Sequence, residues 1–166
     1  MERETQLSIE ENNKIKKSCA FTGHRVLGGD FSKRKLKAQI KKLIEEGVDI
    51  FYNGMAMGFD LLAAETVLSL KRKYPQIKLI ACVPCYNQEK SFPEEEKKRY
   101  VKILKKADKT EMLSPHYYNG CMQYRNRFMA DRADILVAYC NEKTGGAAYT
   151  VNYYQKTKPL NEILFI

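Results

Sequence analysis

Short apolar runs alternate with segments of helical periodicity from Ser18 to the end of the chain. Strands are expected at the compact apolar runs, namely Cys19–Phe21, Val48–Tyr52, Ile77–Val83, Thr110–Leu113, Ile135–Cys140 and Ile163–Ile166. Helices are expected where apolar positions recur every three or four residues, namely Ser32–Glu46, Leu61–Arg72, Pro93–Ala107, Gly120–Arg132 and Ala147–Gln155. This alternation predicts an α/β fold, a single three-layer domain whose mostly parallel sheet is flanked by helices.

The first 17 residues are polar and aperiodic, so we expect a flexible N-terminal tail over 1–17 and one domain over 18–166. The tail has no apolar centre, and no apolar run approaches the roughly 18 residues of a membrane-spanning helix. With 29 Lys and Arg against 20 Asp and Glu, the net charge of +9 favours anionic partners. Five cysteines are an odd number for a disulfide framework. These features predict a cytoplasmic protein without membrane insertion.

The loops of unusual composition all follow predicted strands. They are Thr22–Arg25, Asn53–Asp60, Pro84–Tyr86, Ser114–His116 and Asn141–Gly146. Because parallel strands end at the same edge, these loops are expected to meet at the carboxyl edge of the sheet, where open α/β folds bind ligands.

The segment Asn53–Asp60 is a glycine-containing turn between a strand and a helix. This turn contains Gly54, Met55 and Gly58, and its two glycines allow a ligand to approach the backbone closely. The helix that follows offers free N–H groups to a phosphate. Asp60 either caps this helix or accepts hydrogen bonds from sugar hydroxyls. A tight turn without any ligand remains an equal alternative for this segment taken alone.

A second glycine turn follows the strand at Ile135–Cys140. Gly145 and Gly146 provide bare backbone at another helix N-terminus, and Thr144 or Thr150 can donate a hydroxyl. Two such turns at one sheet edge together predict binding of a phosphate or nucleotide.

Two further groups of polar residues are candidates for the same site. Thr22, Gly23, His24 and Arg25 end the first strand, where Arg25 can bind a phosphate and His24 can act as acid or base. The alternative is a surface turn with a solvated Arg25.

The helix at Gly120–Arg132 contributes the second group. Arg125 and Asn126 are expected to face the ligand. Arg127 and Asp131, four residues apart, are expected to form a surface pair.

Standard signatures are missing elsewhere. No G-x-G-x-x-G follows the first strand, and Gly29 stands where a P-loop requires Lys. Cys82 and Cys85 have redox spacing, but the cysteines are too scattered for a zinc site, so we expect no metal. The basic helix around Lys33–Lys42 is expected to be a solvated face, with nucleic acid as a less favoured partner.

Several motifs together resemble the YpsA-like family of the SLOG superfamily, whose Rossmann-like domains are related to DprA/Smf and to the LOG phosphoribohydrolases. The resemblance rests on Cys19–Arg25, Gly54–Glu65, Arg125-Asn126 with Asp131, and Thr144–Thr150 followed by Asn152-Tyr153. It implies a Rossmann-like domain that binds a nucleotide-like ligand of the ADP-ribose, NAD or nucleoside phosphate class. It also implies a sensor or regulator linked to cell division or stress, with a homodimer as an open alternative.

The chain departs from the LOG motif Pro-Gly-Gly-x-Gly-Thr-x-x-Glu. Thr144 stands at the Pro, Ala148 at the third Gly and Asn152 at the catalytic Glu. An amide cannot replace that carboxylate, and Glu65 is a candidate substitute. Nucleotide binding is therefore the preferred function, and cleavage of a nucleotide N-glycosidic bond by Glu65 or Asp60, or DprA-like binding of single-stranded nucleic acid, are the alternatives.

Overall fold

The computed structural model describes residues 17–166, and the tail expected over 1–17 lies outside them apart from Lys17. Six strands form one sheet in the order β4-β3-β2-β1-β5-β6, and every neighbouring pair is parallel. The strands are β1 (Ser18–Gly23), β2 (Ile50–Asn53), β3 (Lys78–Val83), β4 (Lys109–Met112), β5 (Ile135–Tyr139) and β6 (Ile163–Phe165). The expected α/β fold is confirmed, and the described sheet is parallel throughout.

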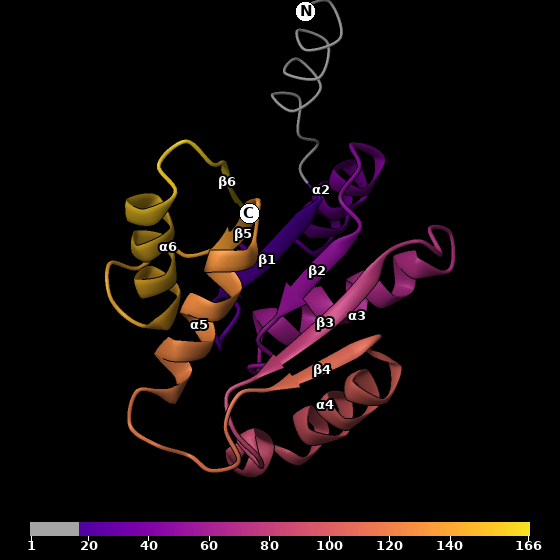
Figure 1. Ribbon diagram of the computed structural model, residues 1–166. Helices are drawn as coiled ribbons and strands as arrows, with labels where there is room; N and C mark the ends of the chain where they lie inside the picture. The colour runs from indigo at the N-terminus through magenta and orange to yellow at the C-terminus, as the bar shows by residue number, and fades with distance from the viewer. Residues whose placement is uncertain (1–16) are drawn as a thin grey trace, which may run out of the picture.

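Helices cover both faces of this sheet (Figure 1). They are α2 (Lys33–Glu45), α3 (Phe59–Lys71), α4 (Glu94–Lys106), α5 (Cys121–Arg132) and α6 (Gly146–Thr157), with a short 3₁₀ helix η1 (Gln88–Ser91) before α4. Helices α2, α3 and α4 pack on one face, and α5 and α6 pack on the other, so the domain has the three layers of a Rossmann-like fold. None of the described helices combines the length and apolarity needed to cross a bilayer.

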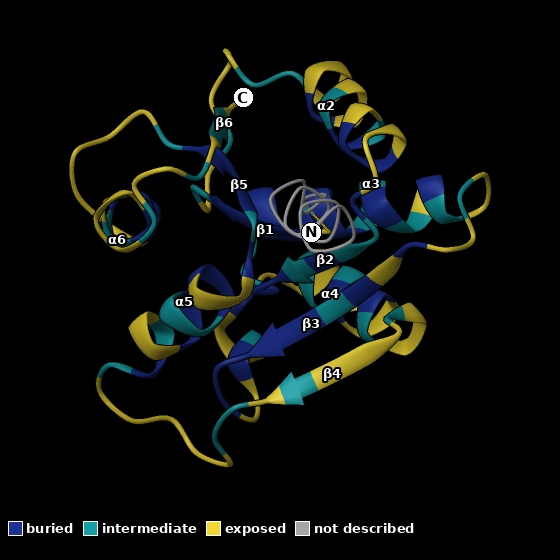
Figure 2. Cartoon of the chain, turned by 45° about the horizontal axis from the view of Figure 1, so that its top comes forward, coloured by how far each residue is buried: buried dark blue, intermediate teal, exposed yellow. Residues whose placement is uncertain are grey.

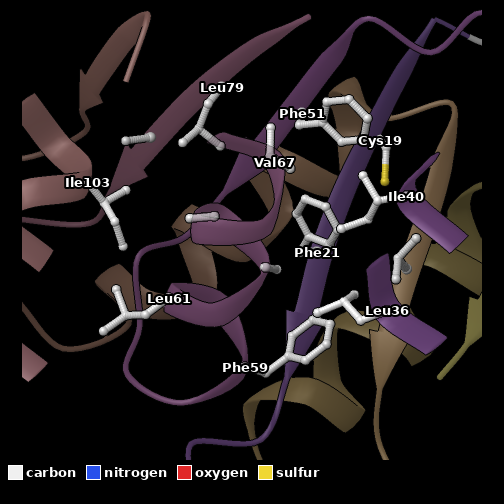
Figure 3. Packing of buried hydrophobic residues seen from close by; sticks show 14 of the residues in the cluster. Cys19, Phe21, Leu36, Ile40, Phe51, Phe59, Leu61, Val67, Leu79 and Ile103 are labelled. Atoms are coloured by element: carbon white, nitrogen blue, oxygen red, sulfur yellow. The ribbon is translucent and has the colours of Figure 1, made fainter. Parts of the chain in front are cut away.

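The two faces of β1 bury different residues because successive side chains of a strand point in opposite directions. Cys19 and Phe21 belong to the core under α2 and α3, whereas Ala20 belongs to the smaller core under α5 and α6. Phe21 stacks on Phe51 of β2 with ring centroids 5.9 Å apart, and Phe59 packs edge-on against it (Figure 3). Figure 2 shows that the neighbouring strands β1 and β5 are almost entirely buried and that the edge strand β4 is largely exposed.

Local signals place most helix ends correctly. Ser32 caps α2 by accepting a hydrogen bond from the Lys35 N–H, and Gly47 follows the helix with φ of 108°. The expectation that Asp60 caps α3 is wrong. The helix begins at Phe59 with Gly58 at the cap position, so Asp60 lies in the first turn. The sequence pattern also missed η1, which is too short to show a helical period.

The strand order creates one place where neighbouring loops diverge. Strands β1 and β5 are neighbours, but the chain continues from β1 to α2 on one face and from β5 to α6 on the opposite face. Such a switch point leaves a crevice beyond the carboxyl ends of the two strands.

Candidate functional site

A cleft of about 530 Å³ opens at this switch point. Its walls come from the loop after β1, the start of α3, the buried side of α5 and the loop that leads from β5 into α6. The volume lies within the range of small-molecule sites in proteins. The cleft is thus the candidate functional site.

His24 connects three of these walls. Its N–H donates to the Tyr139 carbonyl at the end of β5, and its own carbonyl accepts from the Phe59 N–H at the start of α3. Its imidazole Nε2 accepts a 3.0 Å hydrogen bond from the Asn141 N–H. This bond requires an unprotonated Nε2, so the proton of the neutral ring lies on Nδ1. His24 therefore positions the loop after β5 relative to β1.

Asp60 is the buried carboxylate of the cleft, and the residue as a whole is only 6% exposed. Its Oδ2 accepts from the Ala56 N–H at 3.3 Å, whereas Oδ1 has no hydrogen-bond partner among the described residues. Burial raises the pKa of Asp60 to about 6, although Arg125, the Ala56 hydrogen bond and Arg25 act in the opposite direction. A buried acceptor without a donor is costly, and a ligand hydroxyl would relieve that cost.

Arg125 is the buried cation behind Asp60. Its guanidinium donates to the Gly54 carbonyl, and its Nε donates to Asn126 Oδ1 at 2.9 Å. Burial lowers the pKa of Arg125, and the neighbouring Asp60 opposes this effect; arginine nevertheless stays charged in proteins. A Cβ at Gly54 would lie 3.0 Å from the guanidinium, so a glycine at this position lets Arg125 pack against the turn.

The N-terminus of α6 lines the opposite side of the cleft. Gly145 and Gly146 both face the cavity, and Gly145 adopts φ of 99°, a conformation that favours glycine. No described side chain caps this helix. Because the first turn of any helix has N–H groups without intrahelical partners, the end of α6 presents donors and a positive dipole to an anion.

The first glycine turn differs from this arrangement. Asn53 Oδ1 accepts from the Met55 N–H at 2.8 Å, Asp60 accepts from the Ala56 N–H, and the Phe59 N–H bonds to His24. These amides are already paired within the protein. The amides of Met55, Ala56 and Phe59 are therefore not available to a ligand, and Asp60 and Arg125 occupy this side of the cleft.

Most of the residues predicted for the site meet in the cleft. The cavity is lined by Thr22, Gly23, His24, Arg25, Asp60, Arg125, Asn126, Thr144, Gly145 and Gly146. Five other candidates do not line it: Gly54, Met55, Gly58, Glu65 and Thr150.

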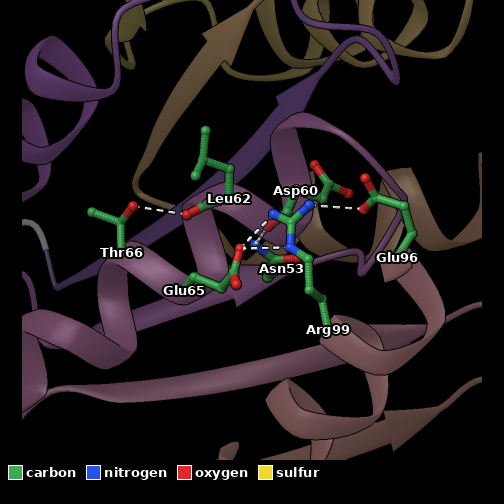
Figure 4. Close-up of polar contacts among 7 residues, drawn as sticks. All are labelled: Asn53, Asp60, Leu62, Glu65, Thr66, Glu96 and Arg99. Atoms are coloured by element: carbon green, nitrogen blue, oxygen red, sulfur yellow. Dashed lines mark hydrogen bonds and ion pairs between the residues drawn. The ribbon is translucent and has the colours of Figure 1, made fainter. Parts of the chain in front are cut away.

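The residues outside the cleft have other partners. Met55 is part of the core, and Gly58 packs against the main chain of Arg25. Thr150 donates its hydroxyl to the Gly146 carbonyl inside α6. Glu65 bonds to Arg99 of α4, which Figure 4 shows between Glu65 and Glu96. The carboxylate proposed as a substitute catalytic acid is therefore bound to a cation outside the cleft.

The expected pair between Arg127 and Asp131 is wrong. Arg127 donates to the Tyr149 hydroxyl at 2.8 Å, and the Tyr153 hydroxyl donates to Asp131 at 2.6 Å. Both partners belong to α6, so these residues join two helices. Spacing along one helix cannot reveal a closer partner on its neighbour.

The cysteines give no sign of a metal centre. Cys82 is buried, and this burial raises its pKa to about 12, which suppresses the reactive thiolate. Within residues 17–166, no three His, Cys, Asp or Glu side chains cluster in a way that would hold a metal ion.

Several residues that line the cleft were not among the candidates from the sequence, and four of them illustrate why. Ala56, Met122, Tyr139 and Asn141 line the cavity. Tyr139 ends the buried strand β5 and Asn141 lies just beyond it, which is a usable signal because ligand sites collect at the carboxyl ends of strands. Ala56 and Met122 carry no chemical signature, and only the packing of the turn and of α5 identifies them.

Solved structures of DNA processing protein A (DprA) have a similar fold. The protein from Helicobacter pylori matches with a TM-score of 0.65 and 19% identity, over 91% of this chain and 65% of that one. The protein from Streptococcus pneumoniae matches with a TM-score of 0.64 and 16% identity, over 90% of this chain and 50% of that one. The chain thus spans only about half to two thirds of these proteins, and the likeness is one of fold.

Sequence comparison gives a more specific relationship. The UPF0398 protein BH1768 from Halalkalibacterium halodurans is 34% identical over 136 residues, which cover 80% of this chain and 72% of the relative. The profile of YpsA, described as the YspA SLOG family, matches residues 28–164. This span contains the carboxyl ends of β2 and β5, all five described helices and most of the cleft. The chain belongs to the YpsA family of SLOG proteins.

Proposed function

We propose that this protein is a cytosolic sensor or regulator that binds a nucleotide-like ligand in the cleft between β1 and β5. The observation that carries the proposal is the pairing of two unsatisfied features on opposite walls. Asp60 Oδ1 is a buried acceptor without a donor among the described residues, and the uncapped N-terminus of α6 presents donors without acceptors. A nucleotide has hydroxyl donors and phosphate acceptors joined in one molecule.

The charges in the cleft support this orientation. The phosphate would accept hydrogen bonds from the start of α6 at Gly145 and Gly146, where the helix dipole adds positive potential. Arg25 is exposed at the mouth of the cleft and shows no ion pair to any described residue, so its guanidinium is available to the same anion. The ribose would donate to Asp60.

Calorimetry with ADP-ribose, NAD, ATP, AMP and a cyclic nucleotide tests the proposal. At least one should bind, and Asp60→Asn should weaken binding of that ligand about tenfold, because the amide removes a charged acceptor. Asp131→Asn is the matched control, since Asp131 bonds to Tyr153 outside the cleft. Failure of the whole panel to bind would refute the proposal.

Cleavage of a nucleotide N-glycosidic bond is a second candidate, favoured by the raised pKa of Asp60. A carboxyl group that titrates at about 6 can both donate and accept a proton near neutral pH. Incubation with NAD or with nucleoside monophosphates, followed by chromatography, should then release free base, and Asp60→Asn should abolish that release. If a nucleotide binds but remains intact after prolonged incubation, the protein binds it without cleaving it.

The same binding experiments also test whether the ligand is a nucleic acid. The DprA protein of H. pylori, which shares the fold, binds single-stranded DNA. Oligothymidylate is therefore added to the panel at two salt concentrations. Binding whose affinity falls steeply with salt, together with no affinity for free nucleotides, would favour a nucleic acid ligand instead.

A further inference from the structure

A second pocket lies at the same edge of the sheet, beyond the strands on the other side of the Gly54 turn. Its volume is about 610 Å³. One wall is the loop from β3 through η1, and the other is the loop from β4 to α5. Both loops stand out in the sequence for their composition, and neither lines the nucleotide cleft. Met122 of α5 lines both cavities.

Gln88 is the polar residue that stands out in this pocket. It is 8% exposed, and its Nε2 donates to the Gly54 carbonyl at 3.3 Å. Because a carbonyl can only accept, this bond fixes which end of the side-chain amide faces Gly54. The Oε1 atom is buried and has no partner among the described residues. A buried acceptor in a pocket wall calls for a donor from a ligand.

Two tyrosines give the pocket an aromatic character. Tyr86 on the first loop is 66% exposed, and Tyr117 on the second is 69% exposed. Neither ring is needed to fill the core, and both line the cavity. Exposed aromatic rings at a pocket are platforms on which planar heteroaromatic rings stack.

We infer that this pocket binds a planar heteroaromatic ring that carries an exocyclic amino group, of the adenine type. The amino group donates to Gln88 Oε1, and the ring stacks on Tyr86 or Tyr117. Since Met122 lines both cavities, the ring and the phosphates of a single nucleotide-like ligand occupy neighbouring sites. The inference rests on the proposed function only for this link between the cavities.

NMR titration with three separate probes tests the inference. Adenosine carries the amino group, inosine has an oxygen in its place, and inorganic pyrophosphate probes the cleft alone. Adenosine should shift the amide signals of the two pocket loops and bind about tenfold more tightly than inosine, whose oxygen would face the Gln88 acceptor. Pyrophosphate should shift the signals of Thr144–Ala147 instead.

Variants identify the ring platform. Tyr86→Ala and Tyr117→Ala together should weaken adenosine binding about tenfold and leave pyrophosphate binding unchanged. Tyr124→Ala is the matched control, because Tyr124 is 45% exposed on α5 and lines neither cavity. All three side chains are exposed, so the variants should fold, which a thermal melt verifies.

The outcomes separate the two proposals. Equal affinity for adenosine and inosine, no binding of adenosine at millimolar concentration, or insensitivity to the double tyrosine variant would each overturn the inference. Pyrophosphate binding at Thr144–Ala147 would in those cases still support the phosphate half of the proposed function. Tyrosine-dependent adenosine binding without any pyrophosphate binding would support the ring pocket and contradict the phosphate site.

Discussion

Arg125 joins segments that are distant in the sequence. From α5 it reaches the carbonyl of Gly54 after β2, and its positive charge lowers the pKa of the buried Asp60 more than that of Arg25 does. Since both ionic groups are desolvated, each depends on the other more than a surface pair would. Arg125 therefore contributes both to the local order of the turn at Gly54 and to the charge balance of the cleft.

Replacing this cation should be strongly destabilising. We expect Arg125→Met to lower the free energy of unfolding by about 3 kcal/mol, because Asp60 loses its counter-charge and the Gly54 carbonyl loses one of its two side-chain donors. Chemical denaturation measures the change. Arg127→Met, which removes a hydrogen bond to Tyr149 of α6, should cost less than about 1 kcal/mol. Equal losses in the two variants would contradict this account.

Asp60 should also make stability depend on pH. Its pKa is about 6 in the folded protein against 3.8 for the unperturbed group, so the folded state binds this proton more tightly than the unfolded chain. The contribution of Asp60 to unfolding free energy is therefore most favourable below about pH 4, falls as the pH rises to about 6, and stays low above it. This difference in pKa corresponds to about 3 kcal/mol of unfolding free energy.

The comparison with Asp60→Asn isolates this effect. The amide does not titrate, so the difference in unfolding free energy between the native protein and the variant should change across pH 4 to 6 in favour of the native protein at the acidic end. Denaturation series at several pH values in this interval provide the measurement. A difference that is constant with pH would show that Asp60 titrates normally.

At the scale of elements, the N-terminus of α6 combines a backbone requirement with an electrostatic one. Gly145 holds φ of 99°, and a Cβ there would meet no atom within 4 Å, so the restriction is conformational and not steric crowding by neighbours. The helix N-terminus is aimed at the cleft only while the loop from β5 keeps this conformation.

Gly145→Ala should consequently affect both stability and binding. We expect a loss of about 1 to 2 kcal/mol in unfolding free energy, from the strain of a left-handed conformation, and weaker binding of pyrophosphate in the NMR titration. Gly29→Ala is the control, because Gly29 has no positive φ and no atom close to its added Cβ. Unchanged pyrophosphate affinity in Gly145→Ala would argue against α6 as the anion site.

At the scale of the whole molecule, the cleft depends on the order of the strands. The loops from β1 and β5 separate because their helices cover opposite faces, and His24 then bonds to Tyr139 and Asn141 across the gap. A ligand in this position contacts segments from both ends of the chain. Binding should therefore stabilise the fold as a unit.

This stabilisation can be measured as a thermal shift. At a concentration about 100 times its Kd, the ligand identified by calorimetry should add about 2.7 kcal/mol to the unfolding free energy. For a domain of this size, that corresponds to a rise in Tm of roughly 5 to 10 °C. Asp60→Asn should give a smaller rise at the same concentration, and an unchanged Tm for a ligand that binds by calorimetry would contradict binding to the folded cleft.

Much of the fold follows from local patterns. The buried strand at Ile135–Tyr139, the amphipathic period of α2 and the stop at Gly47 are properties of short segments, and the structure confirms them. The family motifs likewise point to the correct fold. The alternation of strands and helices was sufficient to predict a parallel sheet because parallel strands need crossover helices.

The partners of individual side chains could not be predicted in the same way. Asp60 looks like a helix cap in sequence, but Gly58 occupies that position and Asp60 turns toward Arg125. Glu65 looks available for catalysis, but Arg99 from the next helix binds it. Neither contact leaves a trace in local sequence, because the residues are more than 30 positions apart.

The amino-acid sequence by itself determined the elements, their parallel arrangement and the sheet edge at which polar loops gather, because these depend on periodicity and chain connectivity. The tertiary structure alone decided that one glycine turn opens onto the cleft while the other is filled by Arg125, and that Gln88 lies buried beside a second pocket. The physical reason is that hydrogen-bond partners and desolvation are set by which helices pack together, and that packing is a property of the whole chain.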